Sequence, residues 1–249
     1  MAILISLHGV VDGIFFEVLD PKAYAVCADG NGVTALYKPC GVQSVPNIDG
    51  RVDRKSIVRA PYDSKRRCYI LPDGQTFFLL NRLDTPTSGL LVGCFDETIA
   101  EAIRWCFFNR EVHKIYCALT RYQKIQEAGE FYDILTKQRE QGHLRVAPGR
   151  CDEAVARYGV ERELEMGGIP LLRLRLEPVT GRTHQLRVQC ALRKIPIIGD
   201  KIYGDFTLNR KLWAVLPEKR LYLQSCAIKF SYKFHAKTYL FSAKIPCEF

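Results

Sequence analysis

Asp84 is placed where a negative charge is costly, in a turn between two apolar runs. The turn spans Asn81–Gly89, and the runs are Thr76–Leu80 before it and Leu90–Phe95 after it. A carboxylate this close to apolar strands must be paired or hydrogen-bonded, or its pKa rises. Arg82 is two residues away and could supply a charge partner. On these residues alone, an aspartate that caps its own turn is the simpler interpretation.

A second cluster gathers hydrogen-bond donors at the start of an expected helix. The stretch Thr180–Gln189 reads T-G-R-T-H-Q-L-R-V-Q, and Thr183 is a candidate cap for a helix that ends near Leu192. A helix N-terminus with added arginines is a natural anion site. A solvated helix start explains the same residues equally well. The stretch Ile195–Gly204 follows and is typical of a structured loop with an architectural role.

The net charge favours a polyanionic partner. The 249 residues hold 36 Lys and Arg against 27 Asp and Glu, a net charge of +9. The segment Arg51–Arg67 alone carries seven basic residues against two acidic ones. Such clusters suit nucleic acid, because each neutralised phosphate releases counterions. A solvated surface that is merely basic is the alternative, and no basic amphipathic helix points to a membrane surface.

Composition and cysteine spacing set the protein class. The hydrophobic share of 47% and charged share of 25% are ordinary globular values, which exclude a disordered chain. No stretch reaches the roughly 18 apolar residues of a membrane span, and no basic region precedes the apolar N-terminus as in a signal peptide. The ten cysteines show no C-x-x-C spacing and suit buried thiols in a reducing compartment. We therefore expect a cytoplasmic, soluble protein without a metal site.

Strand patterns dominate the chain. Alternation and apolar runs predict strands, among them a hairpin, in the following ranges: Val33–Tyr37, Thr76–Leu80, Leu90–Phe95, His113–Thr120, Ala154–Glu165, Leu171–Glu177 and the tail from Arg220. Asp96 caps an expected helix in which Ile99, Ala102, Ile103 and Cys106 recur at helical spacing. Mixed strands with few helices favour an α+β fold over a parallel one. No Gly-rich phosphate loop is present, so we expect no nucleotide cofactor.

Six stretches together resemble the RluA-type RNA pseudouridine synthases. They occur in the family's order and span about residues 33–249: Lys38–Pro46 (K-P-x-G-x-x-x-x-P), Asn81–Leu90 (H-R-L-D-x-x-T-S-G-L), Val112–Ala118 (V-x-K-x-Y-x-A), Gly181–Val188 (G-R-T-H-Q-L-R-V), Pro196–Gly204 (P-I-x-G-D-x-x-Y-G) and Arg220–Phe230 (R-L-x-L-H-A-x-x-L-x-F). The resemblance implies a pseudouridine synthase catalytic domain over 33–249, with a central mixed, mainly antiparallel sheet flanked by helices and loops. It leaves 1–32 as an N-terminal extension of unclear role.

The resemblance also implies a reaction and its residues. A uridine in structured rRNA or tRNA is flipped out and isomerised to pseudouridine, without cofactor or metal. Asp84 matches the catalytic aspartate, a nucleophile or base at the sugar. Arg187 matches the cation that pairs with it, and Tyr116 matches the active-site tyrosine that stacks on the base and assists proton transfer. We expect a monomer with RNA as its partner and no membrane contact.

Four further positions are expected to bind substrate. Arg82 matches a position that fills the vacated base stack or binds backbone. Arg182 and His184, at the helix start, are expected to contact phosphate or orient the pocket. Leu223 matches an aliphatic residue beneath the base, although ordinary core packing explains it as well.

The sequence departs from the family pattern at three histidines, which are replaced by Asn81, Gln189 and Gln224. Amides form hydrogen bonds but cannot titrate. These changes, with the net charge, support the alternative of a non-catalytic RNA-binding or RNA-folding protein on the same scaffold. A glycoside-cleaving enzyme fits less well, because it requires a second carboxylate in a setting comparable to that of Asp84.

Overall fold

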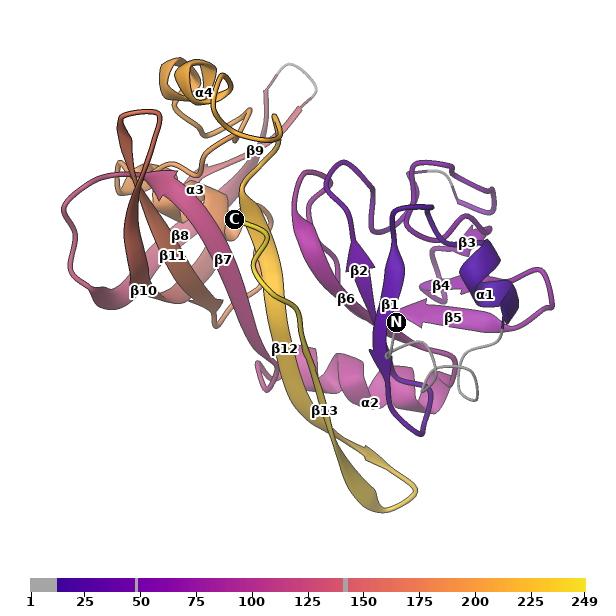
Figure 1. The fold of residues 1–249 in the computed structure, drawn as a ribbon. Helices are drawn as coiled ribbons and strands as arrows, with labels where there is room; N and C mark the ends of the chain where they lie inside the picture. Colours follow the sequence, from indigo (N-terminus) through magenta and orange to yellow (C-terminus); the bar gives the residue numbers. More distant parts are fainter. Residues whose placement is uncertain (1–12, 48, 141–142) are drawn as a thin grey trace. The chain divides into compact units, whose positions relative to one another are not determined.

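The computed structural model describes residues 13–47, 49–140 and 143–249, and their contacts divide the chain into two compact units. Unit 1 comprises the chain up to His113 together with Cys226–Pro246, and unit 2 comprises Lys114–Ser225 together with Cys247–Phe249 (Figure 1). The boundary between the two units falls inside the catalytic domain that the sequence predicts over 33–249. The division into 1–32 and 33–249 therefore stays a prediction. Residues 1–12 of the expected N-terminal extension lie outside the described residues.

Unit 1 is built on two strands that are buried along their whole length and pair antiparallel, β2 (Thr34–Lys38) and β6 (Ser88–Cys94). The other strands extend this pair, with β1 (Tyr24–Ala28) on β2, and β5 (Thr76–Leu79), β4 (Cys68–Ile70) and β3 (Tyr62–Asp63) following β6 in that order. A short helix, α1, spans Gly13–Glu17. The expected strands at Val33–Tyr37, Thr76–Leu80 and Leu90–Phe95 are therefore confirmed.

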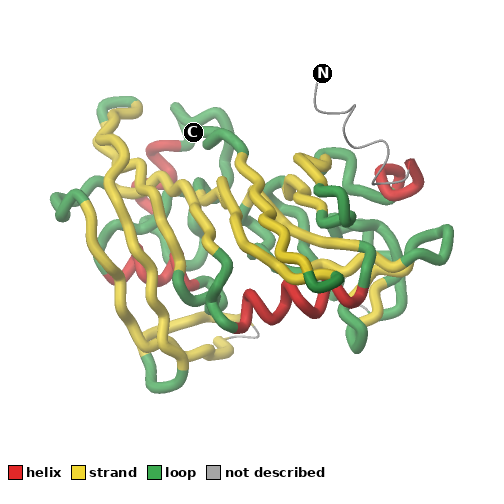
Figure 2. Tube along the Cα trace, turned by 90° about the horizontal axis from the view of Figure 1, so that it is seen from below, coloured by secondary structure: helices red, strands yellow, loops and turns green. Residues whose placement is uncertain are grey.

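The core of unit 1 joins segments that are far apart in the sequence. Helix α2 (Glu97–Phe108) buries Ile99, Ala100, Ile103 and Cys106, and Asp96 caps it by accepting a hydrogen bond from the Ile99 amide, as expected. The hairpin of β12 (Leu223–Phe234) and β13 (Lys237–Lys244) packs into the same apolar cluster through residues that include Ile228, Phe230 and Phe241. The sheet and α2 thus bury a shared core (Figure 2).

Unit 2 is an antiparallel sheet in the order β7 (His113–Arg121), β11 (Ile169–Pro178), β10 (Asp152–Met166), β8 (Ala128–Glu140) and β9 (His143–Pro148). Strand β11 buries Leu172, Leu174 and Leu176, whereas the residues between them face outward, which confirms the predicted alternation. Gly167 and Gly168 join β10 to β11 at φ of 58° and 75°, as a tight two-residue hairpin turn requires.

Two helices follow the sheet of unit 2. They are α3 (Gln185–Leu192) and α4 (Phe206–Leu212). The prediction that Thr183 caps α3 is wrong, because His184 is the N-cap, with φ of 53° and no side-chain cap. The Gln185 side chain satisfies this turn instead, since its Oε1 accepts hydrogen bonds from the Arg182 amide at 2.9 Å and the Thr180 hydroxyl at 2.7 Å. Within the described ranges, no helix has the length and hydropathy of a membrane-spanning segment.

Candidate active site

The Asp84 turn of unit 1 is held by hydrogen bonds to the backbone on both sides of the aspartate. Before it, Leu83 donates its amide to Ser44 Oγ at 2.9 Å, and the same hydroxyl lies 2.9 Å from the Leu83 carbonyl. After it, the Thr85 carbonyl accepts from the amide of Gly41 at 2.8 Å. The Asp84 carbonyl closes the turn by accepting from the Thr87 amide at 2.9 Å. The half-buried Asp84 side chain therefore projects from a backbone with little freedom to move.

Lys38 lies beneath this turn and is fully buried. Its ammonium donates to three carbonyls, those of Val42 at 2.7 Å, Pro39 at 3.0 Å and Thr85 at 3.2 Å. Burial lowers the pKa of Lys38 to about 8, against the opposing charges of Cys40 and Asp84. The lysine joins the K-P-C-G stretch to the aspartate turn and places a positive charge near it.

Asn81, one of the amides in place of a family histidine, fastens the start of the turn. Its Oδ1 accepts from the Val92 amide at 2.7 Å, and its Nδ2 lies 3.4 Å from the Leu90 carbonyl. Both partners belong to β6, so the side chain bridges the two apolar strands that flank Asp84. The amide has an architectural task here that needs no titratable group.

Arg187, on α3 of unit 2, forms a buried bidentate ion pair with Asp200. Its Nε donates to Asp200 Oδ2 at 2.7 Å and its Nη2 to Oδ1 at 2.9 Å, and the two side chains are 3% and 1% exposed. Burial alone would raise the pKa of Asp200, but the Arg187 guanidinium and the amides of Tyr203 and Ile202 outweigh it and hold that pKa below its usual value. The pair fixes the direction of the guanidinium.

Tyr203 completes the surroundings of Arg187. The guanidinium carbon lies 5.3 Å from the centre of the Tyr203 ring, a cation–π contact. The Tyr203 hydroxyl lies 2.9 Å from His184 Nδ1 and accepts from the Val146 amide, also at 2.9 Å. The structure thus brings two predicted site residues, Arg187 and His184, together through one tyrosine.

The loop that carries Asp200 is itself tightly constrained. Gly199 has φ of 78°, and a Cβ there would collide with the carbonyl of Arg220. Asn209 of α4 is buried, accepts from the Gly199 amide at 2.8 Å and donates to the Asp200 carbonyl at 3.3 Å. The stretch Ile195–Gly204, expected to be architectural only, contains the aspartate that holds Arg187.

Gln189 and Gln224, the other two amides in place of family histidines, also make structural bonds. Gln189 Nε2 donates to the carbonyl of Ala154 and to the Asp133 carboxylate, both at 3.0 Å, and so ties α3 to the sheet of unit 2. Gln224 Oε1 accepts from the Glu248 amide at 2.9 Å.

Tyr116 and Leu223 belong to one apolar cluster of unit 2. Leu223 is 3% exposed within it, and the half-buried Tyr116 packs against it from β7. Lys114 lies two residues before Tyr116 and therefore shares its face of the strand. Burial lowers the pKa of Lys114 to about 8.

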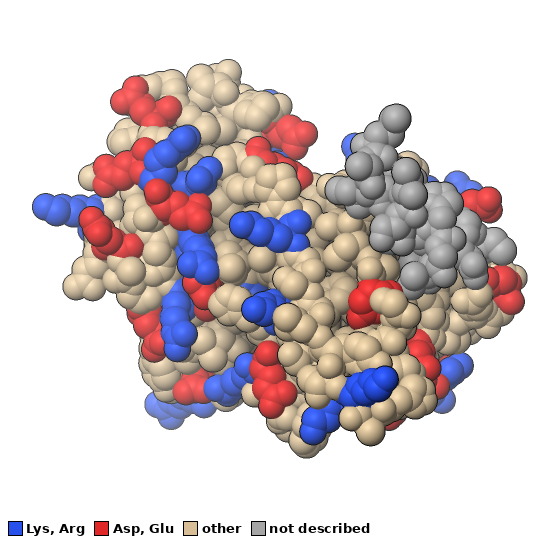
Figure 3. All heavy atoms as spheres, turned by 60° about the horizontal axis from the view of Figure 1, so that its bottom comes forward, with Lys and Arg blue, Asp and Glu red and all other residues tan. Residues whose placement is uncertain are grey.

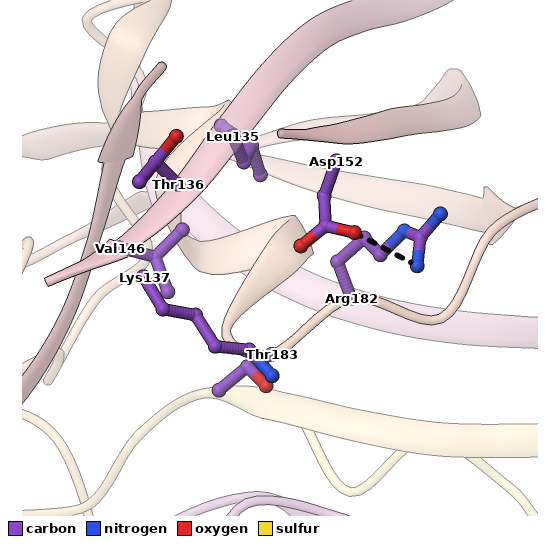
Figure 4. A pocket seen from close by; sticks show the side chains of 7 residues that line it. All are labelled: Leu135, Thr136, Lys137, Val146, Asp152, Arg182 and Thr183. Atoms are coloured by element: carbon purple, nitrogen blue, oxygen red, sulfur yellow. Dashed lines mark ion pairs between the residues drawn. The ribbon is translucent and has the colours of Figure 1, made fainter. Parts of the chain in front are cut away.

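Two arginines that were expected to contact the substrate, Arg82 and Arg182, differ in exposure and in ion pairing within the protein. Arg82 is exposed. Arg182, by contrast, pairs with Asp152 at 3.1 Å and donates to the Glu153 carbonyl at 3.0 Å. Figure 4 shows this pair at the rim of a small hollow, where Lys137 extends toward Thr183.

Six of the seven basic side chains of Arg51–Arg67 are exposed, whereas Arg59 is partly buried and is bound to Asp20 at 2.8 Å. The exposed Arg66 pairs with Glu97 at 3.1 Å. On the face drawn in Figure 3, basic side chains are interspersed with acidic ones.

The predicted residues divide between the units. Asp84 and Arg82 lie in unit 1, and the other five lie in unit 2: Tyr116, Arg182, His184, Arg187 and Leu223. The pairing of Arg187 with Asp84 stays a prediction. Sequence reasoning missed Ser44, Asp200 and Tyr203 as supports of the site. The only signal for the last two was their place in a motif of the family.

Comparisons with known proteins agree on one family. A family model for RNA pseudouridylate synthase matches residues 32–192. The chain is 32% identical over 174 residues to tRNA pseudouridine synthase C of Vibrio cholerae. The matched region covers 65% of this chain and 69% of the relative. It is 31% identical over 236 residues to the dual-specificity RNA pseudouridine synthase RluA of Vibrio parahaemolyticus, covering 92% of this chain and 85% of the relative.

The fold comparison gives the same result. The structure of human RNA pseudouridylate synthase domain containing 1 superimposes with a TM-score of 0.68 at 20% identity, covering 90% of this chain and 83% of that one. The expected α+β pseudouridine synthase fold is thereby confirmed. From the family match and the relatives, the chain belongs to the RNA pseudouridylate synthase family and is an RNA-modifying isomerase of the RluA type.

Proposed function

We propose that this enzyme isomerises uridine in structured tRNA or rRNA, with Asp84 as the nucleophile or base that acts at the sugar of a flipped-out nucleotide. The observation that carries the proposal is that hydrogen bonds hold the backbone on both sides of Asp84; we call them the clamp. Ser44 bonds to Leu83, and Gly41 and Lys38 bond to the Thr85 carbonyl. A reacting carboxylate gains most from a backbone that cannot drift, because small misplacements of a reacting group are costly in rate.

The proposed reaction conserves every atom of the nucleotide. The bond from the sugar C1′ to the base nitrogen breaks, the base turns, and a bond from C1′ to a base carbon forms while the proton on that carbon is transferred to nitrogen. No electron is gained or lost overall. Asp84 acts at the sugar, and Tyr116 stacks on the base and assists the proton transfer.

Arg187 supplies positive charge to the reacting carboxylate in this proposal. Its Nε and Nη2 are committed to Asp200, which leaves the guanidinium aimed in one direction. Because both members of the pair are buried, the side chain is already ordered before RNA binds.

The test is a pseudouridine map of tRNA and rRNA from cells that lack the protein, before and after incubation with it. We expect new pseudouridine with the wild-type enzyme and none with Asp84→Asn. Asp73→Asn, in a turn of the same unit, is the matched control and should behave as wild type. Product formed equally by the Asp84 variant would refute the catalytic assignment. Salt-sensitive RNA binding without product in any sample would instead support the non-catalytic alternative.

We propose further that the exposed part of the basic segment follows the RNA backbone. Arg51, Arg54 and Lys55 are exposed, whereas Arg59 is paired with Asp20. Replacing the three exposed residues with alanine should reduce the slope of log affinity against log salt by about 2–3, since each phosphate contact contributes about 0.7–0.9. Arg59→Ala is the control and should leave the slope within about one unit of wild type. An unchanged slope in the triple variant would place the RNA elsewhere.

A further inference from the structure

Two cysteines of unit 2 lie in direct contact although 130 positions separate them in the sequence. The Sγ of Cys247 lies 2.7 Å from the Sγ of Cys117. Cys117 is in β7 and 4% exposed, while Cys247, in the final segment of the described chain, is half-buried. One thiol of the pair is therefore within reach of a small solute.

The segment that carries Cys247 is fixed by several independent contacts. Glu248 donates its amide to Gln224 at 2.9 Å, and its carboxylate pairs with Arg220 at 2.7 Å. The ring of Phe249 packs edge-on against Tyr222 with centroids 5.2 Å apart. Because these contacts anchor both residues that follow Cys247, the meeting of the two sulfurs is built into the packing of unit 2.

We propose that Cys117 and Cys247 form a redox pair that closes to an intramolecular disulfide when a hydroperoxide oxidises the protein. The Cys247 thiolate attacks the peroxide, which leaves a sulfenic acid on Cys247 and releases hydroxide or alkoxide. The Cys117 sulfur then displaces water from the sulfenic acid and forms the S–S bond. In total, two thiols lose two electrons and two protons, and the peroxide is reduced to water, or to water and an alcohol.

Geometry and surroundings make this pair selective. A disulfide has its sulfurs about 2.05 Å apart, so that closure moves them together by less than about 1 Å. Two of the other cysteines are protected: burial raises the pKa of Cys94 and of Cys190 to about 12, which keeps both as unreactive thiols. Cys151 is exposed, so its oxidation in the same sample shows how readily a cysteine reacts when solvent exposure is the only factor.

The disulfide would fasten the final segment to the strand that carries Tyr116. Side chains alternate along β7, which puts Cys117 on the opposite face from Tyr116. The disulfide would therefore restrain β7 on the face opposite Tyr116 and would not cover the face that carries Tyr116. It closes a loop of about 130 residues, for which we expect the midpoint of thermal unfolding to rise by roughly 5–15 °C.

The experiment uses the full chain, reduced and then exposed to a small excess of hydrogen peroxide. After alkylation of remaining thiols and digestion with trypsin, mass spectrometry follows two peptides, Ile115–Arg121 and Ile245–Phe249, each with one cysteine. We expect them joined, at a mass 2 Da below the sum of the reduced peptides. The link should revert with dithiothreitol, persist in Cys151→Ser and be absent from Cys247→Ser.

Two outcomes would overturn the proposal. One is that both peptides keep free thiols, or gain only oxygen, at a peroxide dose that oxidises Cys151 in the same sample. The other is that the linked peptides form without any rise in the unfolding midpoint relative to the oxidised Cys247→Ser variant. Both readouts are independent of pseudouridine formation, so a failure here leaves the proposed function untouched.

Discussion

Replacing Asp200 with asparagine keeps the shape of the side chain but removes the charge that faces Arg187. The Oδ1 atom already accepts from the amides of Ile202 and Tyr203, at 2.8 and 3.0 Å, and asparagine retains that oxygen. The other oxygen becomes an NH₂ group opposite the Arg187 Nε, which is itself a donor. Asp200→Asn therefore breaks the ion pair while disturbing the loop little.

The cost follows from burial. Both side chains are nearly inaccessible, at 3% and 1%, so a guanidinium that loses its carboxylate partner cannot be solvated in place. Breaking a buried pair by removing one partner costs about 3–5 kcal/mol. Because asparagine keeps one acceptor, we expect about 3 kcal/mol. In a chain of this length each kcal/mol lowers the unfolding midpoint by about 2–4 °C, which predicts a decrease of roughly 6–12 °C.

The pH dependence gives this prediction a signature. The pKa of Asp200 is lowered in the folded state, so its ionised form stabilises the fold at every pH above the value of an unfolded aspartate, about 3.9. That stabilisation is lost as the pH falls through the lowered pKa. The difference in the free energy of unfolding between wild type and Asp200→Asn should have its full value at pH 7 and should shrink once the pH is below about 4.

Urea unfolding at pH 7, 5 and 3 measures this gap, with Asp205→Asn as the matched control. Asp205 caps α4 and pairs with Arg121 at 3.4 Å with partial exposure, and asparagine is an equally good cap. The control should lose less than about 1 kcal/mol. A loss at Asp200 no larger than this, or a gap unchanged at pH 3, would refute the reasoning. Pseudouridine formation by Asp200→Asn should fall in kcat more than it changes in KM.

Three further substitutions test the supports of the site. Burial lowers the pKa of Lys38 from 10.5 to about 8, so that between these pH values the unfolded chain binds more protons than the folded one. The free energy of unfolding should therefore increase as the pH is raised from 8 to 10. Urea unfolding at these two pH values should show a smaller increase for Lys38→Met. Ser44→Ala removes the hydroxyl that bonds the aspartate turn and should cost about 1–3 kcal/mol, with kcat falling more than KM changes; equal kinetics would show that the clamp is dispensable. Gly199→Ala forces a Cβ against the Arg220 carbonyl and should lower the unfolding midpoint strongly, whereas Gly181→Ala, with open space around it, should not.

The elements were predictable from the sequence because their signals are local. Apolar alternation marks β11, and Asp96 followed by helical spacing marks α2, so both appear where expected. The start of α3 was mistaken because a threonine before a helix is normally its cap. Here the Gln185 side chain accepts the bonds instead, a choice set by its burial between Thr180 and Val155.

The surroundings of the site were less predictable, because they depend on which polar side chains are buried together. An aspartate after a glycine is usually a solvated turn residue, and nothing in the spacing of Asp200 shows that it faces Arg187. The three amides in place of histidines supported the alternative of a non-catalytic RNA-binding protein on the same scaffold. In the structure Asn81, Gln189 and Gln224 each accept or donate a bond that holds the backbone.

The route of the chain through its two units has a consequence for folding during synthesis. Unit 1 needs the β12–β13 hairpin, because residues such as Ile228 and Phe230 fill its core, yet all of Lys114–Ser225 is made first. At roughly 5–20 residues per second, the early part of unit 1 waits on the order of 10 s for its missing strands. Unit 2 has its whole sheet before then. The sheet of unit 2 is thus complete before the core of unit 1, although unit 1 begins first.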